Sequence, residues 1–205
     1  MNRLEAALVS LVGRLTHLGK ESALVGGLAV SARTEPRLTR DVDLAVAVAN
    51  DAEAEQVVKE LVAGGYVAAT VIEQESVKRL ASVRFIMPRE TSRGVVADLL
   101  FASSGIEPIL VAEAEPLEVF TGTTVRVARV GHLIALKLLA RDDETRPQDA
   151  VDLRALRNVV TDEELERARN AVTLIEKFGF SRGRDLARLL EEWVAGVPSA
   201  RRGSK

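Results

Sequence analysis

Two aspartates stand at alternate positions where an apolar segment begins. Asp41 and Asp43 flank Val42 and are followed by the apolar run 44–48. Because successive side chains of a strand point to opposite faces, both carboxylates fall on one face and the larger apolar side chains on the other. Adjacent carboxylates repel each other, and a divalent cation supplies a physical reason for placing them together. The spacing predicts a site for one or two Mg²⁺ ions.

A third carboxylate interrupts a second apolar run. Asp98 lies within residues 95–101, where an unpaired charge would be costly to bury. If the two strands are neighbours, Asp98 joins Asp41 and Asp43, and two metal ions about 3.5–4 Å apart in such a cluster support in-line displacement at phosphorus. The residues alone leave a structural alternative open, in which Asp41 caps its strand, Asp43 is solvated and Asp98 pairs with an arginine such as Arg84.

A pair of glycines separates a short apolar run from a predicted helix. Gly26 and Gly27 follow residues 23–25 and precede residues 28–33. Glycine lets a backbone approach a phosphate closely, and a helix N-terminus attracts anions. The pair therefore predicts a phosphate contact, although a Gly-Gly pair by itself is commonly just a turn. The chain contains neither a dinucleotide-binding fingerprint nor a P-loop.

Charged residues recur at helical spacing in the segment 132–153. Lys137 and Arg141 are four residues apart and share one helix face, while Asp149 and Asp152 are three apart and share a face of the next helix. Considered alone, these four residues indicate a salt-bridge network on a helical surface.

In combination, these motifs resemble the DNA polymerase β-type nucleotidyltransferase superfamily. The first block consists of Val25-Gly26-Gly27-Leu28-Ala29, then Arg37, Thr39, Asp41 and Asp43, then Asp98. Its Arg-x-Thr-x-Asp-x-Asp-Leu spacing is similar to that of the AbiEii branch, the toxin subunits of type IV toxin–antitoxin pairs, which includes the MenT toxins. The block from His132 to Leu153 supports the same branch, and Gln148 stands where that family often has a lysine.

The resemblance implies transfer of a nucleoside monophosphate from an NTP to an acceptor hydroxyl, with Mg²⁺ or Mn²⁺ bound by Asp41, Asp43 and Asp98. The residues implied in catalysis are Asp41, Asp43, Asp98, Lys137 and Asp149. The residues implied in nucleotide binding are Gly26, Gly27, Arg37, Thr39, Lys137, Arg141 and Asp152. By the same resemblance the acceptor is a tRNA 3′ end, and a cognate antitoxin is the protein partner.

Two other functions stay open on the sequence. A small-molecule nucleotidyltransferase, such as the aminoglycoside-modifying enzymes, shares the Gly-Gly and Asp-x-Asp motifs; an acidic pocket would favour it, whereas an exposed basic face would favour RNA. The other is a non-catalytic nucleotide-binding or antitoxin-like module on the same fold. The presence of Asp98 beside Asp41 and Asp43 argues against that module.

Composition narrows the class of protein further. The 205 residues carry a net charge of -2 and 3% aromatic residues, which argues against a non-specific nucleic-acid binder built on a basic surface or on stacked bases. The lack of cysteine excludes disulfides, thiolate zinc sites and a cysteine nucleophile. The sequence shows no signal peptide and no apolar run of membrane length, so we expect a cytoplasmic protein without membrane contact.

The elements that must position these residues change character near residue 130. The strands are predicted at 23–25, 40–48, 82–87, 95–101, 118–121 and 124–130, and the early helices at 4–18, 28–33 and 50–64. The later helices are predicted at 132–141, 147–157, 161–178 and 181–194. We therefore expect an α/β (α+β) fold: a nucleotidyltransferase core of mixed sheet flanked by helices over residues 1–130, followed by a helical region over 131–205.

Local signals in the helical region have structural interpretations. Residues 161–164 read as a capping box. The stretch 179–183 matches the Gly-x-Ser-x-Gly hydrolase elbow, but a helix precedes it, so we interpret Gly179 as a helix C-cap and Ser181 as the next N-cap. His132 is expected to be a surface or capping residue.

Overall fold

The computed structural model describes residues 2–75, 77–88, 94–142 and 147–196. Within these residues the strands are β1 (Ser22–Val25), β2 (Asp41–Val46), β3 (Val67–Gln74), β4 (Arg79–Ile86), β5 (Val96–Leu100), β6 (Glu115–Phe120) and β7 (Thr123–Val127). The helices are α1 (Arg3–His17), α2 (Gly26–Arg33), α3 (Asp51–Ala63), α4 (Glu107–Glu113), α5 (Val130–Ala140), α6 (Pro147–Arg157), α7 (Asp162–Lys177) and α8 (Leu186–Ala195).

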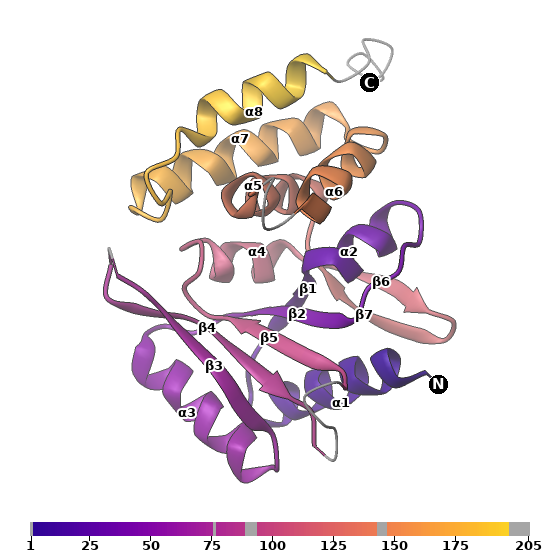
Figure 1. Cartoon of the computed structure of the whole chain (residues 1–205), viewed down its shortest axis with the longest axis vertical. Helices are drawn as coiled ribbons and strands as arrows, with labels where there is room; N and C mark the ends of the chain where they lie inside the picture. Colours follow the sequence, from indigo (N-terminus) through magenta and orange to yellow (C-terminus); the bar gives the residue numbers. More distant parts are fainter. Residues whose placement is uncertain (1, 76, 89–93, 143–146, 197–205) are drawn as a thin grey trace.

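The strands form one mixed sheet in the order β3-β4-β5-β2-β1-β7-β6. In the view of Figure 1, α1 and α3 lie below the sheet, whereas α2, α4 and the C-terminal helices α5–α8 lie above it. The expected α/β class is confirmed by this arrangement of helices around a mixed sheet.

Strand β2 lies near the middle of the sheet because its apolar side chains can be buried. Val42, Leu44 and Val46 are each at most 1% exposed, whereas Asp41 and Asp43 alternate with them and are half-buried. β2 pairs antiparallel with β1 and parallel with β5, so it has a neighbour on both sides. The predicted alternation of faces is confirmed.

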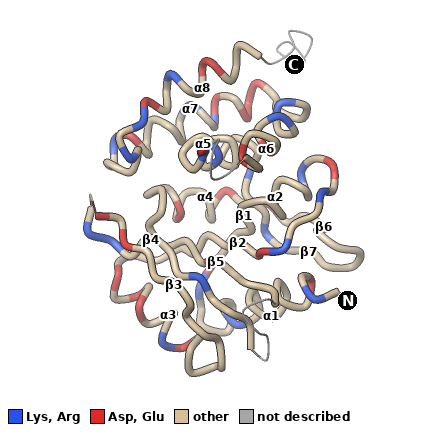
Figure 2. Tube along the Cα trace, viewed as in Figure 1, with Lys and Arg blue, Asp and Glu red and all other residues tan. Residues whose placement is uncertain are grey.

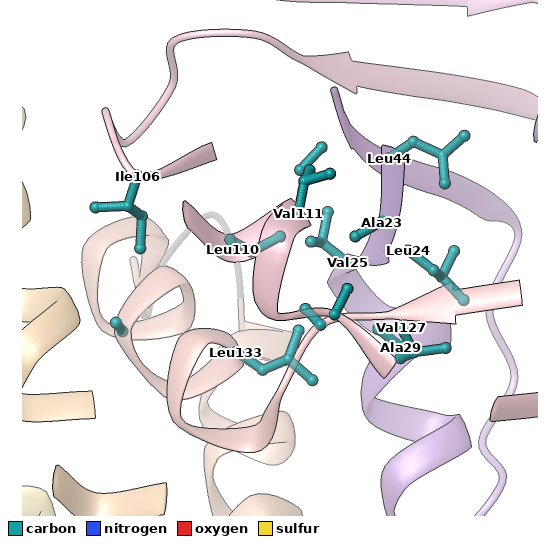
Figure 3. Close-up of a cluster of buried hydrophobic side chains, with 14 of the residues drawn as sticks. Ala23, Leu24, Val25, Ala29, Leu44, Ile106, Leu110, Val111, Val127 and Leu133 are labelled. Carbon is teal, nitrogen blue, oxygen red and sulfur yellow. The ribbon is translucent and has the colours of Figure 1, made fainter. Parts of the chain in front are cut away.

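The buried core joins the sheet to the helices above it. Figure 3 shows one cluster to which β1, β2, β7, α2, α4 and α5 all contribute side chains. Leu24, Leu44, Leu110 and Leu133 in this cluster are at most 1% exposed. Truncating such a side chain to alanine costs about 2–5 kcal/mol, so this packing fixes α5 against the sheet.

Most predicted elements are present, and two were missed. β3 is exposed along nearly its whole length, so its sequence carries no burial pattern. α4 has only seven residues and contains a proline in its first turn, which leaves too short a segment for helical periodicity to be recognised.

The structure confirms the predicted caps only in part. Thr161 accepts a hydrogen bond from the Glu164 amide, but the Glu164 carboxylate accepts one from the Gly131 amide at 2.6 Å and so ties α7 to α5. α8 starts at Leu186 with Asp185 as its N-cap, not Ser181. The C-cap of α7 is Phe178, so Gly179 falls one residue outside the helix, with a φ of 82°.

Within the described residues, no helix is both long enough and apolar enough to span a membrane.

Candidate active site

Three charged side chains stand in register on three neighbouring strands, and a fourth lies on the same face. Asp43 of β2 is the register partner of Asp98 of β5, and Asp98 is the partner of Arg84 of β4. Neighbouring strands are about 4.8 Å apart, and register partners point to the same face. Asp41, two residues before Asp43, faces the same way. We call Asp41, Asp43, Asp98 and Arg84 the carboxylate row.

Arg84 binds Asp98 through both carboxylate oxygens. Its Nε and Nη2 donate to Asp98 Oδ1 and Oδ2 at 2.8 and 2.6 Å, and Nη2 lies 3.9 Å from Asp41 Oδ2. Hydrogen bonding to Asp98 raises the pKa of Arg84 above its usual value. The pairing of Asp98 with Arg84, which the sequence offered as the structural alternative, is therefore present together with the alignment of the carboxylates.

Burial and like charge act together on Asp41. Burial raises the pKa of the Asp41 carboxyl above its usual value, Arg84 and Arg40 oppose the rise, and the charge of Asp98 adds to it. Among the described residues, no group of three or more carboxylate or histidine side chains is already arranged around a common metal position. A metal at Asp41, Asp43 and Asp98 therefore stays a prediction, and it would require Asp98 to share its oxygens with another cation.

The glycine pair makes room for side chains of the protein itself. A Cβ on Gly26 would stand 1.9 Å from Asp43 Oδ2, and Gly26 has a φ of 66°. A Cβ on Gly27 would stand 2.4 Å from Arg37 Nη2 and 3.4 Å from Thr39 Oγ1. Both positions thus require glycine for internal packing, a reason that the sequence motif does not reveal.

The second motif forms a buried ionic network of Arg37, Lys137, Asp149 and Asp152. Lys137 Nζ lies 2.7 Å from Asp149 Oδ1 and 2.8 Å from Asp152 Oδ2. Arg37 donates from Nε and Nη2 to the two oxygens of Asp152 at 2.7 and 2.9 Å. The side chains of Lys137, Asp149 and Asp152 are 9%, 2% and 0% exposed. The ion pairs of Lys137 with Asp149 and Asp152 agree with the orienting role that the family resemblance implies for the two carboxylates. The surface network that the spacing alone indicates is ruled out, because Lys137, Asp149 and Asp152 are buried where α2, α5 and α6 pack together.

The buried ionic network and the carboxylate row meet at the start of α2. Gly26 touches Asp43 of the row, and Gly27 touches Arg37 of the network. Thr39 lies half-buried beside Gly27, and Arg141 is the half-buried C-cap of α5. Gln148 is exposed on α6. The structure therefore brings both predicted motifs to one end of α2.

His132 was expected at the surface and is instead 2% exposed. Burial lowers its pKa to about 4, with Glu113 and Glu164 acting in the opposite direction. Its Nε2 lies 3.9 Å from Glu113 Oε2. His132 is therefore a neutral core residue at neutral pH.

Acidic residues balance the arginines of the C-terminal helices. Figure 2 shows both signs of charge interspersed along α7 and α8. Arg167 contacts Glu113 and Glu164 at 2.8 Å, and Arg169 contacts Glu191 at 3.0 Å. These contacts neutralise the arginines locally, so the surface of α7 and α8 is neither uniformly positive nor uniformly negative.

Comparison with known proteins places the chain in a family. The family model described as Nucleotidyl transferase AbiEii toxin, Type IV TA system, matches residues 11–200. No curated protein matches the sequence. An antigenic nucleotidyltransferase-like protein from Paracoccidioides brasiliensis has a similar structure, with 18% identity, a TM-score of 0.51 and 92% of each chain covered.

Two antibiotic-modifying enzymes are more distant matches. The lincosamide antibiotic adenylyltransferase LnuA is 13% identical, with a TM-score of 0.49 and coverage of 78% of this chain and 100% of that one. The enzyme ANT(2")-Ia, in complex with adenylyl-2"-tobramycin, is 16% identical, with a TM-score of 0.46 and coverage of 92% and 97%. The family match over most of its length shows that this chain belongs to the AbiEii nucleotidyltransferase toxins of type IV toxin–antitoxin systems.

Proposed function

We propose that this nucleotidyltransferase moves a nucleoside monophosphate from an NTP to the 3′ hydroxyl of a tRNA, as the toxin of a pair whose antitoxin is a cognate protein. The observation that carries the transfer reaction is the register of Asp43 with Asp98, beside a glycine that leaves space for the Asp43 carboxylate. The antitoxin partner follows from the family, and the tRNA acceptor from the resemblance to its toxins. Both NTP and tRNA are cytoplasmic molecules, so the reaction would take place in the cytoplasm.

The donor set fits a hard divalent cation. Asp41, Asp43 and Asp98 share one face of two adjacent strands, and carboxylate oxygens are the ligands that Mg²⁺ and Mn²⁺ prefer. These three residues would hold the ion. When bound, it would polarise the phosphoryl oxygens and favour ionisation of the acceptor hydroxyl.

The chain's own groups would bind and orient the reactants. Asp98 would accept the proton of the attacking hydroxyl. Val25, the N-cap residue of α2, makes no side-chain hydrogen bond to the helix, and the backbone N–H groups of Gly27 and Leu28 are suited to a phosphate oxygen. Pyrophosphate is the leaving group, and the helix N-terminus would stabilise its charge.

The buried ionic network would place one further cation near the phosphates. An ammonium has three donors, and Lys137 uses two of them on Asp149 and Asp152. The third would be directed at a phosphate oxygen, which gives the two carboxylates the role of orienting the lysine. Arg37 directs Nε and Nη2 at Asp152, which favours an orienting role for it as well.

Transfer of label from NTP to RNA tests the proposal. The purified chain would be incubated with Mg²⁺, total tRNA and each of the four NTPs in turn, labelled at the α-phosphate. We expect label on intact tRNA, no label on tRNA whose 3′ diol was destroyed by periodate, and no transfer from γ-labelled NTP. Transfer to an aminoglycoside in place of tRNA would assign the small-molecule function, and transfer to neither would contradict the proposal.

The toxin role has a separate test in cells. Expression of the chain alone is expected to slow the growth of a bacterial host, and co-expression of the cognate antitoxin is expected to restore it. Normal growth under expression of a folded, active chain would contradict the toxin role and leave the transfer reaction standing.

A further inference from the structure

Arg84 is the one member of the carboxylate row that the proposed reaction does not use. It occupies both oxygens of Asp98 and lies within 3.9 Å of Asp41, which are two of the three residues assigned to the metal. The charges of three carboxylates and one guanidinium add up to -2, and Arg40 also acts on Asp41. The guanidinium therefore already provides part of the neutralisation that a divalent ion would provide.

We infer that Arg84 is an internal counter-cation that competes with the divalent metal for Asp98, so that metal binds tightly only together with the nucleotide. The inference rests on the proposed function, because it takes the metal site at Asp41, Asp43 and Asp98 as given. It assigns to Arg84 a positioning role: the side chain acts on the reaction through Asp98.

Competition follows from the limited capacity of one carboxylate. Both oxygens of Asp98 accept a charge-assisted hydrogen bond in a paired, bidentate geometry, which is the strong form of this contact. A metal that takes an oxygen of Asp98 weakens this geometry and brings its own positive charge towards the guanidinium. Metal alone therefore weakens the contact between Arg84 and Asp98 and gives the guanidinium no other anion in exchange.

The nucleotide removes this penalty. An NTP brings a polyanionic triphosphate to the same face of the sheet, and a released guanidinium can pair with a phosphate oxygen bidentately. The side chain of Arg84 is 46% exposed, and its register partner on β3 is the exposed residue Thr70. Arg84 thus has an open sheet face along which to move, without disturbing the core.

Binding of Mn²⁺ in the absence of nucleotide measures the competition directly. We expect Arg84→Gln to bind Mn²⁺ about three- to tenfold more tightly than the wild type. This factor corresponds to the energy of one partly exposed ion pair, which the metal no longer has to weaken. A non-hydrolysable NTP analogue should tighten Mn²⁺ binding in the wild type and do so less in Arg84→Gln. Arg84→Lys keeps the positive charge but loses the bidentate geometry of the guanidinium, so its Mn²⁺ affinity should lie between those of the wild type and Arg84→Gln.

Arg79→Gln is the matched control, because Arg79 lies on the same strand and pairs with Asp51 of α3 on the other face of the sheet. It also loses one partly exposed arginine–aspartate pair, and we expect its Mn²⁺ affinity to equal that of the wild type. Circular dichroism of every variant in metal-free buffer shows which ones are folded. If Arg84→Gln does not fold, the Arg84→Lys affinity decides.

Each outcome separates the inference from the proposed function. Mn²⁺ binding that is lost in Asp43→Asn but unchanged or weaker in Arg84→Gln would overturn the role of Arg84 and keep the metal site. Mn²⁺ binding that Asp43→Asn leaves unchanged would overturn the metal site, and the role of Arg84 with it. Tighter binding in Arg84→Gln but not in Arg79→Gln supports the inference.

Discussion

The carboxylate row and the buried ionic network contain similar groups in opposite surroundings. In the row, the side chains of Asp41 and Arg84 are 44% and 46% exposed. In the network, Asp149 and Asp152 are at most 2% exposed, and Lys137 lies between them. Water can replace a lost partner in the row, whereas nothing can replace one in the network. The row is therefore suited to exchanging ligands, and the network to holding α2, α5 and α6 together.

Removing one anion from each cluster should give very different losses of stability. Asp152→Asn leaves Lys137 and Arg37 without their shared partner, and we expect unfolding free energy to fall by about 3–5 kcal/mol. Asp98→Asn removes a partly exposed partner of Arg84 and should cost about 1 kcal/mol or less. Urea unfolding in metal-free buffer measures both. Equal losses would contradict the contrast between the two clusters.

Acid should lower the folding stability of the protein through His132, which lies on α5, the same helix as Lys137. Its pKa is about 4 in the folded chain against 6.5 when unfolded, since it is buried among Glu113, Glu164, Arg129 and Arg167. Above pH 6.5 both states are neutral. Below it only the unfolded chain gains a proton, so stability falls towards pH 4 by about 3 kcal/mol at most.

The variant His132→Leu removes this titration and should lack that part of the acid-induced loss. His17→Gln, at the exposed histidine of α1, is the control and should follow the wild type. Unfolding free energies at several pH values between 7 and 4 provide the measurement. Parallel curves for wild type and His132→Leu would show that His132 is not the group responsible.

The glycine pair allows the two clusters to be disturbed one at a time. Gly26→Ala forces a side chain into a positive φ and against Asp43, and we expect a loss of about 1–3 kcal/mol together with loss of transfer activity. Gly27→Ala pushes on Arg37 and should loosen its contact with Asp152. If Gly26→Ala keeps full activity, the contact with Asp43 does not matter for the reaction.

The sequence predicts features that depend on local periodicity and not those that depend on strand order. Asp41 and Asp43 fall on one face because their spacing alone decides it. The position of Asp98 beside Asp43 depends on parallel pairing of β2 with β5, which could be stated only as a condition before the strand order was known. Arg84 was named as a possible partner, but its place opposite Asp98 depends on β4.

Burial of charge was the harder quantity to predict. Lys137 and Asp152 have helical spacing that fits an exposed face equally well, and only the packing of α5 and α6 on α2 encloses them. The same holds for His132, whose burial depends on α4 and α7. The family motif did carry a signal of burial, because it combines one lysine with two aspartates that can neutralise it.

If the carboxylate row holds the catalytic metal, the variant Asp43→Asn should lose activity without losing stability. The change is nearly isosteric, and it removes one of three carboxylate charges that repel one another. We predict that NTP incorporation falls by about 10³-fold or more, while the melting temperature without Mg²⁺ stays the same or rises. Unchanged incorporation would remove Asp43 from catalysis, and lost incorporation with a collapsed melting temperature would make it a structural residue.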